Sequence, residues 1–110
     1  MNITDHAYQM AKERFRYSKD VLDKLAAKAL EQGIRHSDTV GKLHKYIDKI
    51  WFSHRTANNV RIYGEVIYLF HDETLITVYQ LPNNLRAMAK AVKKKKIILW
   101  VNKIKVTFTL

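Results

Sequence analysis

The stretch from Val60 to Gln80 constrains the fold of this chain more than any other. It contains runs rich in Val, Ile, Tyr, Phe and Thr, residues that suit a pleated, half-buried surface. These runs are 60–63, 66–71 and 74–80. Only Gly64-Glu65 and Asp72-Glu73 separate them, and a two-residue loop makes an antiparallel hairpin and fixes its register. The sequence therefore predicts an antiparallel meander over residues 60–80.

Side chains alternate across a strand, so this register divides them between two faces of the sheet. We expect an aliphatic face, buried against helices, with Val60, Ile62, Ile67, Leu69, Ile76 and Val78, and with His71 and Thr74 at its end. The opposite face mixes polar, aromatic and apolar groups: Arg61, Tyr63, Val66, Tyr68, Phe70, Leu75, Thr77 and Tyr79. This second face is either another packing surface or a working surface for RNA, where rings stack on bases and a cation binds phosphate.

The composition is that of one small globular domain. The chain has 110 residues, of which 47% are hydrophobic and 27% charged, and it contains no cysteine. Its longest purely apolar run, residues 97–101, is far shorter than the ~20 residues that span a bilayer. The first ten residues lack the basic-then-apolar pattern of a signal peptide. We therefore expect a cytoplasmic protein that does not bind membranes.

Positive charge is concentrated at the C-terminal end. The net charge is +10, and residues 81–110 hold eight basic residues and no acidic one. We expect this segment to attract nucleic acid, although a lysine run can also serve only to keep a chain in solution. The expected RNA-binding residues are Tyr63, Tyr68, Arg55, Arg86, Lys90, Lys93, Lys94, Lys95 and Lys96.

Helices are expected on both sides of the meander in sequence. Apolar residues at helical spacing predict helices over 3–17, 19–32 and about 39–53, and a short basic helix over 84–96. Their expected N-caps are Asn2 or Thr4, Ser18, and Ser37 or Asp38, and Gly33 is expected to end the second helix. Alternation over 97–110 predicts a final strand. The expected fold is α+β, with the N-terminal helices on one face of a small antiparallel sheet. We divide the chain into a domain over 1–82 and a basic extension over 83–110.

Arg14 falls near the middle of the apolar face of the first predicted helix. An unpaired buried charge is costly, so Arg14 needs a carboxylate, carbonyl oxygens or an anionic ligand. His6 lies at the edge of the same face, two turns earlier, where it is either an ordinary surface histidine or a functional one. These two residues are the first candidates for a site.

The sequence lacks several well-known catalytic and metal-binding motifs, which limits the types of reaction that the protein could catalyse. The five histidines lack the spacing of a known metal motif, and there is no glycine-rich phosphate loop and no GxSxG elbow. We therefore expect neither a metal nor another cofactor. Ribonuclease chemistry remains open to such a basic chain, because RNA supplies its own nucleophile, the 2′-hydroxyl. The protein must then provide a base, an acid and cations.

A family resemblance rests on three features: His6-Ala7 followed by Arg14, the tyrosine-rich hairpin, and the late strand 76–79. Over residues 3–82 the chain resembles small bacterial domains near RelE/ParE-type toxins, within the barnase/EndoU/colicin/RelE ribonuclease grouping. The resemblance implies N-terminal helices packed on an antiparallel sheet, with an active site on the open sheet face. Its matching positions are His6, Arg14, Arg61, Thr77 and Tyr79. The chain has more helical residues before the sheet than a minimal RelE-type toxin, and its tail has no counterpart there.

Two functions follow as expectations. The first is an RNA-binding, toxin-like domain that acts as a metal-independent endoribonuclease of toxin–antitoxin or mobile-element type. Its RNA could be ribosome-associated, and an acidic antitoxin or another protein is the expected partner. The alternative is a non-catalytic module that binds RNA or protein, such as a phage- or plasmid-type inhibitor.

Overall fold

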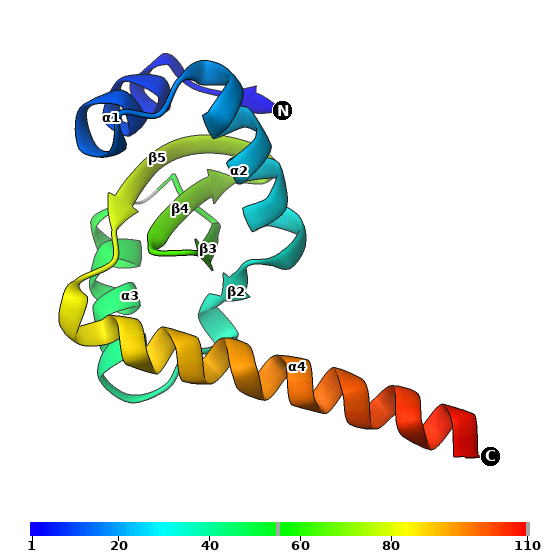
Figure 1. Ribbon diagram of the computed structural model, residues 1–110. Helices are drawn as coiled ribbons and strands as arrows, with labels where there is room; N and C mark the ends of the chain where they lie inside the picture. The colour runs from blue at the N-terminus through cyan, green and yellow to red at the C-terminus, as the bar shows by residue number, and fades with distance from the viewer. Residues whose placement is uncertain (55, 110) are drawn as a thin grey trace.

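The protein is described here from a computed structural model, which defines the backbone of residues 1–54 and 56–109 and the side chains of 1–54 and 56–98. Its centre is a five-stranded mixed sheet in the order β1-β5-β4-β3-β2 (Figure 1). The strands are β1 (Asn2–Ile3), β2 (Ile34–Arg35), β3 (Asn59–Tyr63), β4 (Val66–His71) and β5 (Thr74–Gln80). The helices are α1 (Asp5–Phe15), α2 (Lys19–Gln32), α3 (Gly41–Ser53) and α4 (Arg86–Thr109), with short 3₁₀ turns η1 (His36–Asp38) and η2 (Asn83–Leu85). The fold is therefore α+β, as the sequence predicts.

Local signals place the first two helices where the sequence predicts them. The Thr4 side chain accepts a hydrogen bond from the Ala7 N–H at the start of α1, and Ser18 does the same for Val21 at the start of α2. Helix α3 begins at Gly41 after Val40, so neither Ser37 nor Asp38 is its N-cap. Asp38 instead accepts a hydrogen bond from the backbone N–H of Arg35.

Strands β3, β4 and β5 pair antiparallel, and both two-residue turns lie where the sequence places them. Tyr63 is opposite Val66, and His71 is opposite Thr74. The short strand β1 pairs parallel with the first residues of β5, and β2 pairs antiparallel with β3. Because β1 covers only Thr74 and Leu75, the edge of β5 beyond them has no strand partner among the described residues.

The expectation that the N-terminal helices all pack on one face of the sheet is wrong for α3. Figure 1 shows α1 and α2 on one side of the sheet and α3 and α4 on the other. The α1/α2 side is formed by the mixed face, where Val66, Tyr68, Phe70, Leu75 and Val78 pack against the two helices. The aliphatic face packs instead against α3 and α4; its strand residues are Val60, Ile62, Ile67 and Leu69. Both faces are apolar enough to be buried, so the chain forms three layers.

An irregularity in β5 changes the predicted faces. Leu69 is opposite Thr77 and Phe70 is opposite Leu75, which leaves Ile76 as an extra residue in β5. Such a bulge reverses the alternation of every residue that follows it. Val78 therefore joins the α1/α2 side, while Thr77 and Tyr79 turn to the α3/α4 side. The two hairpin turns could not reveal this shift, because both lie outside it.

The strand predicted over 97–110 is also wrong for the residues that the structure describes. Helix α4 runs without interruption to Thr109. Its first turn belongs to the core, because Ala89 is buried against α3 and the sheet, as is Leu85 at the end of η2 just before the helix. Ala and Lys favour helix, and a helix already started propagates more readily than a new strand forms without a partner. Within the described part of the chain, no helix has the length and apolarity that crossing a membrane requires.

Candidate functional site

The open edge of β5 lies beside a small recess of about 280 Å³. The recess is lined by Thr4, His6, His54, Thr56, Ile76 and Thr77. Thr4 is held against β5, since its N–H donates to the Leu75 carbonyl at 3.0 Å and its hydroxyl to the Ile76 carbonyl at 3.3 Å. This anchor places His6, in the first turn of α1, next to β5. Two histidines from distant parts of the sequence thus share one recess.

His54 and Tyr79 form a hydrogen bond on the α3/α4 side of the sheet. His54 follows the last residue of α3, and its Nε2 bonds to the Tyr79 hydroxyl. The two rings are tilted, with centroids 5.4 Å apart. The bulge in β5 makes this bond possible, because it turns Tyr79 toward α3. His54 is not among the site residues predicted from the sequence, although a histidine at a helix C-terminus is a recognised place for a tunable proton carrier.

Arg14 reaches the same edge from α1. Its Nη1 donates a hydrogen bond to the Val78 carbonyl, and its guanidinium carbon lies 4.5 Å from the centre of the Tyr79 ring. The expectation that Arg14 needs carbonyl oxygens or another partner is therefore met by a carbonyl and an aromatic face. The side chain is exposed, not buried within the α1/α2 core, so its other N–H groups face solvent.

Thr77 contributes the least expected feature of the recess. Its side chain is only 2% exposed, and its Oγ1 is a buried oxygen without a hydrogen-bond partner among the residues that the structure describes. A buried hydroxyl normally finds a partner, because an unsatisfied one costs about 1–3 kcal/mol. Because this oxygen is buried, a ligand in the recess can contact it only when the neighbouring side chains move.

Arg61 does not join this group. Its Nε donates to the Asn59 side chain at 3.0 Å, and it lines a different recess together with Arg35. Burial and the neighbouring Arg35 charge lower the pKa of Arg61 from its ordinary value. Of the five residues expected to be catalytic, the structure brings together His6, Arg14, Thr77 and Tyr79, and it places Arg61 two strands away.

The two tyrosines expected to stack on bases are part of the molecule's packing. Tyr68 is 1% exposed and lies in the α1/α2 core, where burial raises its pKa well above the usual range. Its ring has no open face for a base. Tyr63 is half-buried against the same core. The expected open sheet face is therefore covered, and the candidate site lies at the β5 edge.

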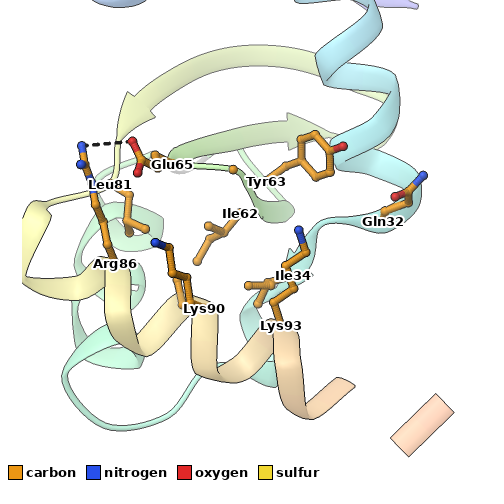
Figure 2. Close-up of a pocket in the computed structure, with 11 residues that line it drawn as sticks. Gln32, Ile34, Ile62, Tyr63, Glu65, Leu81, Arg86, Lys90 and Lys93 are labelled. Atoms are coloured by element: carbon orange, nitrogen blue, oxygen red, sulfur yellow. Dashed lines mark ion pairs between the residues drawn. The ribbon is translucent and has the colours of Figure 1, made fainter. Parts of the chain in front are cut away.

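The basic residues of α4 divide into paired and exposed groups. Arg86 pairs with Glu65 at 3.3 Å, and Lys96 pairs with Asp38 at 2.9 Å. Figure 2 shows Lys90 and Lys93 beside the cavity of about 160 Å³ between α4 and β3, with Ile34, Ile62 and Leu81 at its apolar floor. Lys90, Lys93, Lys94 and Lys95 are exposed. Arg55 lies outside the described residues.

A further group of side chains lies beside the recess that Arg61 lines, and two of its members, His36 and His44, are part of the lining. His36 from η1 meets His44 and Asp48 from α3, and their ligand atoms lie within 4.8 Å of one another. These residues form no metal motif in the sequence, because the two histidines come from different elements. Only the spacing of His44 and Asp48, four residues apart on one helix, could have indicated that two ligands share a face.

Comparisons with protein-family models, with curated proteins and with solved structures gave no match. The resemblance to the RelE-containing ribonuclease grouping therefore stays a prediction, and function has to be inferred from the geometry of the site.

Proposed function

We propose that the protein is a metal-independent endoribonuclease whose active site is the recess at the β5 edge. The observation that carries the proposal is the convergence of His6, His54 and Thr77 on one recess, with Tyr79 bonded to His54. Arg14 lies over Tyr79 and adds a fixed positive charge. These are the groups that cleavage of RNA through its own 2′-hydroxyl requires.

Each residue then has a role in the proposed reaction. His6 removes the proton of the 2′-hydroxyl, whose oxygen attacks the adjacent phosphorus. His54, held by Tyr79, gives a proton to the departing 5′-oxygen, which leaves a 2′,3′-cyclic phosphate and a 5′-hydroxyl. Histidine suits both steps because its unperturbed pKa is about 6.5, near working pH. Arg14 contacts the phosphate oxygens, for which its forked N–H groups are well shaped, and Thr77 donates its unpaired hydroxyl.

The exposed lysines of α4 supply the expected attraction for the RNA backbone. Lys93, Lys94 and Lys95 stand in sequence on one turn of the helix, and each is exposed. Long-range attraction to phosphates raises the rate of encounter and is weakened by salt. In a cell, a protein with this activity needs an inhibitor, and the net charge of +10 favours an acidic antitoxin as that partner.

Cleavage of a labelled RNA in the presence of EDTA tests the proposal. Free RNA and ribosome-bound RNA should both be tried, and the products examined for cyclic phosphate ends. Substituting either recess histidine, His6→Ala or His54→Ala, should lower the cleavage rate by about 10²–10⁴-fold, the usual effect of losing a proton-transfer group. The control His71→Asn removes an exposed histidine that does not line the recess, keeps an amide that can donate to the Thr56 carbonyl, and should leave the rate unchanged.

The arginine has a control on the same stretch of chain. Arg14→Ala should slow cleavage, whereas Arg16→Gly should not, because Arg16 is exposed and holds a left-handed conformation that glycine adopts freely. If the wild type cuts neither form of RNA, the non-catalytic binding module becomes the better description. If cleavage survives all three alanine substitutions at positions 6, 14 and 54, the enzyme is retained and this site is rejected.

A further inference from the structure

We infer that His36, His44 and Asp48 form a binding site for a transition-metal ion, for which Zn²⁺ is the best fit. The site is separate from the β5 recess and does not depend on the proposed ribonuclease activity. It would join the β2–η1 turn, which carries His36, to helix α3, which carries the other two ligands. Two imidazoles and one carboxylate are the protein ligands of many zinc sites that keep a fourth position open.

Both histidines face the same carboxylate group. The Nε2 atom of His36 lies 2.5 Å from Asp48 Oδ1, and the Nε2 atom of His44 lies 3.5 Å from Asp48 Oδ2. Their rings stack, with centroids 4.8 Å apart, so the two imidazoles lie side by side next to this carboxylate. Zn–N and Zn–O bonds of about 2.1 Å place tetrahedral ligands about 3.4 Å apart. All three side chains are only half-buried, and small side-chain rotations would bring their ligand atoms to this spacing.

Thr39 orients His44 as a metal ligand. The Thr39 hydroxyl lies 2.6 Å from the His36 carbonyl, to which it donates its only proton. It must therefore accept a proton from His44 Nδ1, 2.9 Å away. A neutral His44 then carries its lone pair on Nε2, which faces the lone pairs of Asp48. A cation between these atoms satisfies both, and a hydrogen bond at the second ring nitrogen is the usual support of a ligating histidine.

The chemistry of the trio selects the class of ion. Imidazole nitrogen suits Zn²⁺ and its neighbours in the first transition row, whereas Mg²⁺ and Ca²⁺ prefer oxygen ligands throughout. Arg35 and Arg61 line the same recess, and their positive charges oppose a bound cation. We therefore expect an affinity below that of closed four-ligand zinc sites, with the open position turned toward the recess.

The test is direct titration of the full chain, stripped with a chelator and dialysed, with ZnCl₂. Calorimetry should give one Zn²⁺ per chain, and NMR should shift the ring signals of the two ligand histidines before those of His6 and His71. At a free Zn²⁺ concentration of 100 times Kd, Tm should rise by roughly 10 °C. The absence of saturable binding, or ring shifts confined to other histidines, would overturn the inference.

Variants separate a metal site from a simple ion pair. Asp48→Asn and His44→Gln should each lower the affinity for Zn²⁺ at least tenfold, while His71→Ala should leave it unchanged. Circular dichroism checks that each variant is folded. If a variant is unfolded, the wild type is titrated with Co²⁺, whose visible absorption reports nitrogen ligands directly. Zn²⁺ affinity that is unchanged in both folded variants, or Co²⁺ without such a spectrum, would show that His44 and Asp48 only pair with each other.

Discussion

Replacing Thr77 by valine tests whether the unpaired hydroxyl in the β5 recess is kept for function. Thr77 is 2% exposed, and none of the described residues forms a hydrogen bond with its Oγ1. Valine has nearly the same shape as threonine and a similarly high propensity for strands. Thr77→Val therefore removes the hydroxyl and changes little else. Most buried substitutions destabilise a protein, but this one should do the opposite.

The magnitude follows from the contacts of the hydroxyl. An unsatisfied buried hydroxyl costs about 1–3 kcal/mol, and the exchange of OH for CH₃ keeps the cavity filled. We expect Thr77→Val to raise the free energy of unfolding by about 1 kcal/mol, which corresponds to a rise in Tm of about 4 °C for a domain of this size. The same change should reduce RNA cleavage, since the proposed contact with phosphate is lost.

Thr39→Val is the matched control for this prediction. Thr39 is also buried, at 4% exposed, but its hydroxyl bonds to the His36 carbonyl and to His44 Nδ1. Valine leaves His44 Nδ1 without this partner and leaves the His36 carbonyl with only the Thr39 N–H, 3.2 Å away, so the free energy of unfolding should fall by about 1 kcal/mol. Urea unfolding followed by circular dichroism measures the stability of both variants. Where the free energy of unfolding falls with urea at the same slope as in the wild type, the shift of the urea midpoint gives the change in that free energy.

The two valine substitutions should therefore differ in sign. A loss of stability of 1 kcal/mol or more in Thr77→Val would mean that the hydroxyl has a partner, and the case for a functional Thr77 would fail. A stable Thr77→Val protein that cleaves RNA at the wild-type rate would remove Thr77 from the active site and leave the stability argument intact.

Three other predictions concern the framework and the surface. Gly33→Ala should lower the free energy of unfolding by about 1–3 kcal/mol, because the new Cβ would lie 2.4 Å from the Ala29 carbonyl oxygen. Gly33→Asn should lower the free energy of unfolding at least as much, because the φ of Gly33 is −64° and asparagine's tolerance of positive φ does not help there. A Gly33→Asn variant that is as stable as the wild type in urea unfolding would contradict the clash. Burial alone raises the pKa of Asp38, but hydrogen bonds from Lys96 and the Arg35 N–H lower it overall. Its contribution to stability is thus present above the ordinary carboxyl pKa of about 3.9 and lost as pH falls through the lower folded value, so Asp38→Asn should flatten the acid limb of a stability–pH curve. Replacing all three residues 93–95 by glutamine should reduce the slope of the logarithm of the RNA-binding constant against the logarithm of salt concentration by about 2 for single-stranded RNA. An unchanged slope would show that these lysines only help to keep the protein in solution.

The sequence by itself determined the local structure. Ser18 and Thr4 start helices through side-chain hydrogen bonds that need only neighbouring residues, and two-residue turns place the hairpins of the meander. It also indicated His6 and Arg14 as unusual positions. These signals depend on interactions between residues only a few positions apart, so the sequence alone is enough to predict them.

Tertiary structure decided where the faces and the sites lie. The extra residue at Ile76 reverses the side-chain alternation of β5, and only pairing with β4 reveals it. That reversal turns Tyr79 toward His54 and leaves Thr77 beside His6. In the same way, His36 meets His44 only after the β2–η1 turn packs against α3. Contacts between residues far apart in the chain depend on packing and register, and no local pattern in the sequence specifies them.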